Sequence, residues 1–354
     1  MENLIEIKNL DVRFFLKEGT VCAVNGVDLE IAPHATLGVV GESGCGKSIT
    51  ARAMLQILPP RGKIMAGSIR LAPRNAQDKP TDITRLKPGG KEMRRIRGGD
   101  ISMIFQEPMT SLSPVHTVGN QIMESVRLHQ DASKAEARDR AIEMLRLVGV
   151  PMAERRVDAY PHELSGGLRQ RCMIAMALSC HPRLLIADEP TTALDVTIQA
   201  QILNLIERLQ KEFGMAMMMI THDLGVIAET ADHVAVMYLG RIVERGTVRM
   251  IFADPKHPYT MGLLASIPCI GKGNAARLES IPGTLPDPFT TPPGCAFHPR
   301  CPHRINGACD IGDPPIPRSI ASGHTVACHL YPADPILEKT RGCNPLSPMR
   351  KGAS

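Results

Sequence analysis

Hydrophobic and polar positions alternate over residues 4–16, and a second apolar stretch follows at Val27–Ile31. Alternation with a period of two is typical of a strand with one buried face. Further short apolar runs predict the remaining strands, which are Leu37–Val40, Gly67–Leu71, Ile101–Phe105, Leu184–Ala187, Met215–Ile220, and a hairpin formed by His233–Tyr238 and Arg241–Glu244.

Helical patterns lie between these strands. The clearest helices run from Lys47 to about Leu58, from Ser133 to Val148, from Ser165 through Leu178, and from Asp195 to Gly214. Pro59-Pro60 stops the first, because proline cannot continue a helix, and a capping box of Ser133 and Glu136 opens the second. Strands that alternate with helices indicate an α/β fold, and 354 residues leave room for one large domain and a smaller appendage.

The segment between the Leu37–Val40 strand and the first helix matches the phosphate-binding pattern G-x-x-x-x-G-K-[ST]; its sequence is Gly41-Glu42-Ser43-Gly44-Cys45-Gly46-Lys47-Ser48. Glycines let successive backbone N–H groups point at phosphate oxygens, and the following helix adds the positive end of its dipole. We expect Lys47 to reach the β- and γ-phosphates and the Ser48 hydroxyl to ligate Mg²⁺. Cys45 is expected to fill space within the loop. The sequence therefore predicts a nucleoside triphosphate site.

Polar residues follow two later strands where a parallel sheet places its ligands. Asp188 and Glu189 end the strand that begins at Leu184, and carboxylates there can hold Mg²⁺ and an attacking water. The alternative is a simple solvated strand end. His222 follows the Met215–Ile220 strand at the same expected edge, so we interpret it as functional rather than structural.

Two further features have a structural and a functional interpretation. Ser165-Gly166-Gly167 at a helix start offers a hydroxyl and exposed N–H groups for a second anion, but a plain serine N-cap is the alternative. Phe14 and Phe15 stand out because the chain has seven Phe, four Tyr and no Trp. One of them could stack on an adenine ring, and ordinary sheet packing is an equal alternative.

Composition limits the remaining choices. The 41 basic and 36 acidic residues give a net charge of +5, which is too weak to indicate a nucleic-acid partner. No apolar run reaches the ~18 residues that a membrane span needs, and the acidic start shows no export signal, so we expect a soluble protein. Ten cysteines without an export signal indicate reduced thiols or metal ligands in the cytoplasm.

The order of these motifs resembles that of ABC-transporter ATPases over about residues 4–250. The corresponding segments are Gly41–Ser48 (Walker A), Gln106 (Q-loop), Leu164–Leu168 (signature), Leu184–Glu189 (Walker B), Ala193–Asp195 (D-loop) and His222 (H-loop). The run Phe105–Pro114, the segment His257–Thr260 and a cysteine-bearing tail are similar, more narrowly, to ATP-binding subunits of dipeptide/oligopeptide and nickel importers.

The resemblance implies a fold and a domain division. The fold is a P-loop NTPase with a RecA-like core, an antiparallel β subdomain, a helical subdomain at about 107–178, and a small irregular cysteine-containing C-terminal domain. The ATPase domain would cover residues 1–255 and the importer-type extension residues 256–354. Leu168 and Ile49 depart from the residues that many relatives carry, Gln and Thr. The hydrogen-bond donors of Ser165-Gly166-Gly167 and the backbone N–H of Ile49 are still present, so we expect the ATPase function to persist. One weak nucleotide site in a heterodimer is the alternative.

The resemblance also implies a role for each motif residue. Phe14 would stack on adenine, and Gly41–Ser48 with the Ile49 N–H would bind the phosphates. Ser48 and Asp188 would hold Mg²⁺, and Gln106 would sense the metal and the γ-phosphate. Glu189 would polarise the attacking water, and His222 would contact the γ-phosphate. Ser165, Gly166, Gly167 and Asp195 would belong to nucleotide sites shared across a head-to-tail dimer.

The implied protein is an ATP-hydrolysing, energy-coupling subunit at the cytoplasmic face of the inner membrane. Its partners would be a second ABC ATPase (a copy or a paralogue), two integral membrane permease subunits and an extracytoplasmic solute-binding protein. The alternatives are an importer ATPase for nickel or another small solute, and a soluble ABC protein without membrane partners. The signature segment and His222 disfavour a third alternative, a metabolic P-loop kinase.

From about residue 270 the chain is rich in proline and carries Cys295, Cys301, Cys309 and Cys328. So short a segment buries little core and usually needs a covalent or metal staple. The cysteines lack the C-x₂₋₄-C pair that is common in zinc sites, so four thiolates at wider spacing favour a [4Fe–4S] cluster. Some peptide-importer subunits carry such a cluster in this region, which supports the same expectation. Zinc and the absence of metal are the alternatives.

Overall fold

The computed structural model describes all of the chain except residues 1–2, 76, 108–110, 193–194, 268–280 and 332–354. Parts of the predicted Q-loop run (108–110), of the predicted D-loop (193–194) and of the predicted C-terminal domain thus lie outside the described residues. No helix in the described ranges is long and apolar enough to cross a membrane.

A sheet of eight strands forms the centre of the fold, in the order β11-β12-β10-β9-β3-β8-β7-β6. Its strands are β3 (Thr36–Val40), β6 (Ile101–Ile104), β7 (Leu184–Asp188), β8 (Ala216–Ile220), β9 (His233–Tyr238), β10 (Arg241–Thr247), β11 (Arg318–Ala321) and β12 (His324–Val326). The five adjacent strands β9, β3, β8, β7 and β6 are parallel, which confirms the predicted α/β class. Their carboxyl ends therefore lie at one edge, where α/β folds bind ligands.

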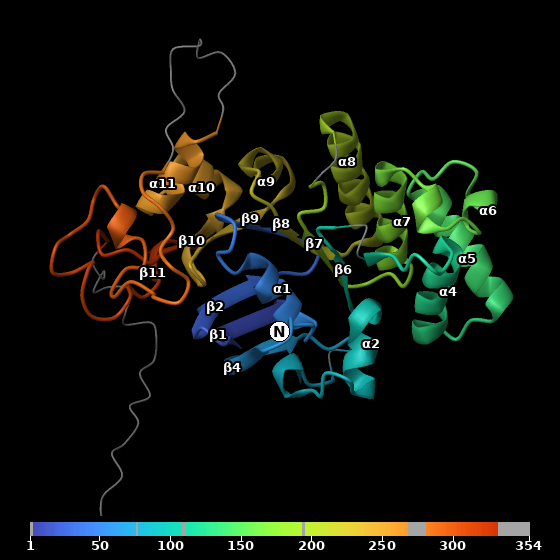
Figure 1. Ribbon diagram of the computed structural model, residues 1–354, viewed down its shortest axis with the longest axis horizontal. Coiled ribbons are helices and arrows are strands. Elements are labelled where there is room, and N and C mark those ends of the chain that lie inside the picture. The colour runs from blue at the N-terminus through green and yellow to red at the C-terminus, as the bar shows by residue number, and fades with distance from the viewer. Residues whose placement is uncertain (1–2, 76, 108–110, 193–194, 268–280, 332–354) are drawn as a thin grey trace, which may run out of the picture.

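A second, antiparallel sheet has the order β2-β1-β4-β5. Its strands are β1 (Ile5–Phe15), β2 (Thr20–Ile31), β4 (Gly62–Leu71) and β5 (Thr81–Asp82). In Figure 1 this sheet lies below helix α1 (Lys47–Met54), which follows the phosphate loop. Buried residues of β1 and β2 share one hydrophobic cluster with β3 and α1, so the smaller sheet supports the loop from beneath.

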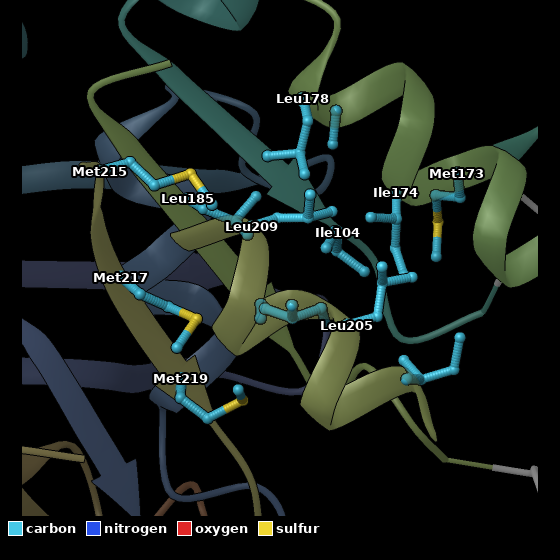
Figure 2. Packing of buried hydrophobic residues seen from close by; sticks show 14 of the residues in the cluster. Ile104, Met173, Ile174, Leu178, Leu185, Leu205, Leu209, Met215, Met217 and Met219 are labelled. Atoms are coloured by element: carbon cyan, nitrogen blue, oxygen red, sulfur yellow. The ribbon is translucent and has the colours of Figure 1, made fainter. Parts of the chain in front are cut away.

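Helices cover the central sheet and form a lobe at one end of the molecule (Figure 1). The lobe holds α4 (Val118–His129), α5 (Lys134–Leu147), α6 (Ala153–Arg156) and α7 (Gly166–Leu178); the other helices are α2 (Lys91–Gly99), α8 (Val196–Phe213), α9 (Leu224–Thr230), α10 (Val248–Ala253) and α11 (Pro258–Ala265), with short 3₁₀ turns at Ile83–Arg85, Pro161–Glu163 and His298–Arg300. Figure 2 shows Ile174 of α7 and Leu205 and Leu209 of α8 in the same buried cluster as Met217 and Met219 of β8. Because all of these side chains are buried, they fix both helices on the sheet.

Local signals set most helix boundaries as the sequence predicts. Ser133 and Glu136 form the capping box of α5, and Gly214 ends α8 in a left-handed conformation. The first helix differs, because α1 ends at Met54 rather than near Leu58. Gln56 takes a positive φ of 49°, so the chain leaves the helix before the prolines are reached.

The C-terminal tail is built into the central sheet rather than standing apart from it. Strand β12 pairs antiparallel with β10, and β11 pairs with β12. The buried side chain of His324 on β12 lies 2.8 Å, Nε2 to Oε1, from the buried Glu244 on β10. Glu244 also accepts the backbone N–H groups of Lys256 and His257. The tail is therefore anchored to the core; the domain boundary at residues 255/256 stays a prediction.

Candidate functional site

The phosphate loop joins β3 to α1, and two of its glycines are required by close packing. Gly46 stands at the start of α1 with φ 104°, and a Cβ there would lie 2.3 Å from the Ala23 carbonyl oxygen. A Cβ on Gly41 would lie 2.2 Å from the carbonyl oxygen of Met237. Any larger residue would push the loop away from the sheet, so glycine is needed at both positions.

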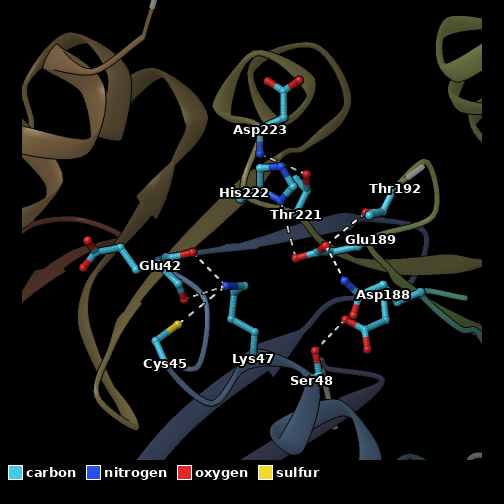
Figure 3. Close-up of polar contacts among 12 residues, drawn as sticks. Glu42, Cys45, Lys47, Ser48, Asp188, Glu189, Thr192, Thr221, His222 and Asp223 are labelled. Atoms are coloured by element: carbon cyan, nitrogen blue, oxygen red, sulfur yellow. Dashed lines mark hydrogen bonds and ion pairs between the residues drawn. The ribbon is translucent and has the colours of Figure 1, made fainter. Parts of the chain in front are cut away.

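Lys47 is held at the mouth of this loop. Its side chain is buried, and Nζ donates to the carbonyl oxygens of Gly41 at 2.7 Å and Glu42 at 3.0 Å (Figure 3). Nζ also lies 3.7 Å from Sγ of the buried Cys45, which fills space beneath the loop as expected. An ammonium group fixed by two carbonyls beside the N-terminus of a helix suits an anionic phosphate chain.

Ser48 and Asp188 meet across the site. The Ser48 hydroxyl donates to Oδ1 of Asp188 at 2.7 Å. Asp188 is buried, and this burial raises the pKa of its carboxyl, although the Ser48 hydrogen bond acts in the opposite direction. A hydroxyl and a carboxylate oxygen fit Mg²⁺, which in nucleotide sites takes one or two protein groups together with phosphate oxygens.

Glu189 is surrounded by polar groups from three elements. Oε2 accepts Gln106 Nε2 at 2.9 Å and Thr192 Oγ1 at 3.0 Å, and Oε1 lies 3.5 Å from Nδ1 of His222 (Figure 3). The structure thus brings together three of the predicted residues, Gln106, Glu189 and His222. Thr192 was not predicted, although its place three residues after a carboxylate allows a local turn bond.

The backbone of Glu189 is itself unusual. It has a positive φ of 47°, and its N–H donates to the carbonyl oxygen of Ile220 at 2.9 Å on the neighbouring strand. Such left-handed conformations cost energy outside glycine and persist where surrounding structure enforces them, often at functional sites. The Glu189 side chain is only 17% exposed.

Ser165 occupies the N-cap position of α7 without capping it. Its side chain makes no cap hydrogen bond, whereas Asp195 caps α8 by accepting the N–H of Ile198 at 3.0 Å. A Cβ added to Gly166 would meet no atom within 4 Å, so the turn faces open space. Within the described ranges, no hydrogen bond or ion pair joins this turn to the phosphate loop. Ser165 thus sits at the N-cap without the side-chain bond of a plain cap, and its role toward an anion stays a prediction.

Phe14 and Ile49 occupy half-buried positions. The ring of Phe14 packs over Gly62, where an added Cβ would lie 2.8 Å from it. Ile49 packs against the same hydrophobic cluster as Phe14. Sheet packing thus occupies part of the Phe14 ring, and adenine stacking stays a prediction.

The four tail cysteines lie near one another. Burial, followed by the charges of the other three thiols, raises the pKa of Cys295 to about 11. The backbone N–H of Ile305 donates to Sγ of Cys309 at 3.5 Å. Across the described residues, however, no group of three or more His, Cys, Asp or Glu side chains could hold a metal ion. The observed arrangement therefore does not support the expected [4Fe–4S] site.

Comparison with known proteins agrees with the fold and the site. The family model described as ABC transporter matches residues 24–192. A second model, described as the C-terminal region of oligopeptide/dipeptide transporters, matches residues 243–309. Among solved structures, a dimeric ATP-binding cassette, MJ0796, bound to ADP and Pi is 26% identical with a TM-score of 0.60, covering 69% of this chain and 99% of that one. The chain cbiO1 from Clostridium perfringens is 28% identical with a TM-score of 0.58, covering 72% and 92%.

Curated relatives match nearly the whole chain. The oligopeptide transport ATP-binding protein AppD of Bacillus subtilis (strain 168) is 50% identical over 332 residues, which are 94% of this chain and 98% of AppD. The dipeptide transport ATP-binding protein DppD of the same strain is also 50% identical over 332 residues, with 93% and 95% covered. The chain belongs to the ATP-binding subunits of ABC transporters, within the oligopeptide/dipeptide transporter family.

Proposed function

We propose that this chain hydrolyses ATP as the energy-coupling subunit of an importer for dipeptides or oligopeptides. The observation that carries the activity is the placement of Glu189, which Gln106 and Thr192 hold by hydrogen bonds and which lies 3.5 Å from His222. The names of the relatives, and the match of residues 243–309 to an importer-specific region, support the peptide substrate. ATP and Mg²⁺ are the substrate and cofactor of the family.

The geometry suggests how each residue contributes. Lys47 and the loop N–H groups bind the β- and γ-phosphates, while Ser48 and Asp188 hold Mg²⁺, which neutralises phosphate charge when bound. Glu189 accepts a proton from the attacking water, a role that typically supplies ~10²–10⁴-fold in rate. Gln106 and His222 lie against Glu189 and orient its carboxylate toward the γ-phosphate position.

A single chain holds only half of each nucleotide site in this proposal. The free Ser165 hydroxyl and the open Gly166-Gly167 turn bind the γ-phosphate of a second cassette, and Asp195 lies in the same interface.

Closure of the two cassettes around ATP is transmitted through the Gln106 region to two integral membrane subunits. An extracytoplasmic solute-binding protein delivers the peptide, and this chain sits at the cytoplasmic face of the membrane. Residues 1–255 supply the ATPase and residues 256–354 the importer-type extension.

Native membranes provide the test of this role. The chain is expected to sediment with membranes, to be released when the integral subunits are absent, and to co-purify with those subunits and a second cassette. Uptake of a labelled dipeptide should stop when the chain is deleted. Loss of nickel uptake alone would favour the nickel alternative, and purely cytosolic behaviour beside intact integral subunits would favour the soluble ABC alternative.

We also propose that the four tail cysteines hold a [4Fe–4S] cluster, with zinc and free thiols as the alternatives. Two observations support this: the thiols lie close enough for the charges of the other three to act on Cys295, and the Ile305 N–H donates to Cys309 Sγ, a kind of bond that stabilises thiolate ligands. Among the described residues the four sulfurs do not form a ligand set, so binding of a cluster requires them to move closer together.

Metal analysis of the full chain purified without oxygen tests this second proposal. We expect a brown protein with broad absorption near ~400 nm and about four iron atoms per chain, lost in Cys301→Ser. Cys22→Ser, a half-buried cysteine on β2, is the matched control and should keep the iron. One zinc per chain would favour zinc, and a colourless preparation without either metal would rule out both.

A further inference from the structure

Glu42, in the phosphate loop, uses all of its polar groups in contacts, one with Lys47 and the others with residues far along the chain. Its carbonyl oxygen accepts Lys47 Nζ at 3.0 Å. Its N–H donates to the Tyr259 hydroxyl at 2.8 Å. Its carboxylate accepts both guanidinium nitrogens of Arg300, at 2.7 and 3.0 Å. The backbone unit that holds the lysine is therefore fixed by Tyr259 and Arg300, which lie 217 and 258 positions away in sequence.

Arg300 and Tyr259 are both held rigidly by their surroundings. The Arg300 side chain is only 4% exposed, and its Nε donates to the carbonyl oxygen of Pro282 at 3.0 Å. Tyr259 is fully buried, with its ring 4.7 Å from that of Tyr238 and 5.4 Å from that of Phe297. A planar guanidinium in bidentate contact with a carboxylate fixes direction as well as distance, which a flexible surface pair does not.

The arginine is also tied to the cysteine group. It lies in the 3₁₀ turn His298–Arg300, between Cys295 and Cys301. Backbone hydrogen bonds fix both ends of the turn. The His298 N–H donates to the carbonyl oxygen of Cys295, and the Cys301 N–H donates to the carbonyl oxygen of His298. The Cys295 N–H in turn donates to the carbonyl oxygen of Cys309. The backbone around the thiols thus determines where Arg300 reaches.

We propose that Arg300 and Tyr259 are positioning residues for the phosphate loop, which hold Glu42 so that Lys47 is ready for the nucleotide. This inference rests on the proposed ATPase function and adds a requirement: nucleotide affinity depends on the tail. Loss of Arg300 leaves the Glu42 carboxylate without its partner and frees the carbonyl that holds Lys47.

The test is a double-mutant cycle on the affinity of the full chain for a non-hydrolysable ATP analogue with Mg²⁺. Arg300→Gln and Glu42→Gln should each weaken binding about tenfold, and the double variant should bind no more weakly than Arg300→Gln, because both remove one interaction. Arg300→Lys keeps the charge and one bond, so it should recover part of the loss. Tyr259→Phe should weaken binding by a smaller factor.

Arg304→Gln is the matched control, because Arg304 is exposed in the same segment and its side chain bonds Asn306. It should bind the analogue as the native chain does. In the assembled transporter, Arg300→Lys should raise KM for ATP more than it lowers kcat, a split that general destabilisation does not produce. If the Arg300→Gln chain does not fold, the affinities of Arg300→Lys and Glu42→Gln for the ATP analogue test the proposal instead. Weaker binding supports the positioning role, and unchanged affinity contradicts it.

Unchanged affinity in a folded Arg300→Gln chain, or strictly additive losses in the cycle, would overturn the inference. Lys47→Ala distinguishes this failure from a failure of the proposed function. If Lys47→Ala abolishes binding and Arg300→Gln leaves it intact, only the positioning role is wrong. If neither change affects binding, the phosphate loop is not the nucleotide site and both proposals fail.

Discussion

Replacing Glu189 by glutamine leaves ATP binding intact and slows hydrolysis by about 10²–10⁴-fold. The amide is nearly isosteric with the carboxylate, so the contacts with Gln106 and Thr192 can persist. It cannot accept the proton of the attacking water, which is the step assigned to Glu189. The measurement is phosphate release by the assembled transporter, alongside nucleotide binding by the same preparation.

Glu207→Gln is the control for this prediction. Glu207 lies on α8, where it pairs with Lys211 on the helix surface, and its loss should leave hydrolysis unchanged. Native turnover in Glu189→Gln would remove Glu189 from the role of general base.

Replacing Ser165 by glutamate should lower hydrolysis about 10²-fold or more without weakening ATP binding to the isolated chain. The Ser165 hydroxyl is not used by its own helix, and the turn makes no hydrogen bond to the phosphate loop of the same chain among the described residues. A carboxylate there would repel the γ-phosphate held by the opposite cassette. The expected signature is a binding-competent, inactive pair.

Ser322→Glu supplies the matched control, since Ser322 lies in the exposed turn between β11 and β12. Loss of ATP binding in the isolated Ser165→Glu chain would mean that the turn serves the nucleotide of its own chain. Native hydrolysis would mean that it serves no nucleotide.

The site was largely predictable from sequence because its parts are local motifs attached to strand ends. Lys47 and Asp188 each follow a recognisable apolar strand, and parallel pairing then brings those ends to one edge. Thr192 could not be predicted in the same way, because a single threonine shortly after a carboxylate is common in ordinary turns. Its bond to Glu189 becomes evident only when the positive φ of Glu189 is known.

The tail was predicted least well, for a physical reason. Strands β11 and β12 are four and three residues long, and too few positions alternate to give a strand pattern. The pair Arg300 and Glu42 is separated by 258 residues, and no local rule links residues so far apart. Composition indicated an irregular appendage, whereas pairing of β12 with β10 makes the tail part of the central sheet.

The sharing of ATP between two cassettes is tested most directly by the sedimentation of Glu189→Gln with and without Mg-ATP, alone and mixed with the cassette that co-purifies with it. We predict that a single-cassette species without nucleotide shifts to a two-cassette species with Mg-ATP, and that Ser165→Glu in the same chain abolishes the shift. A chain that binds ATP tightly yet stays single in both mixtures would contradict the shared site and the transport mechanism built on it.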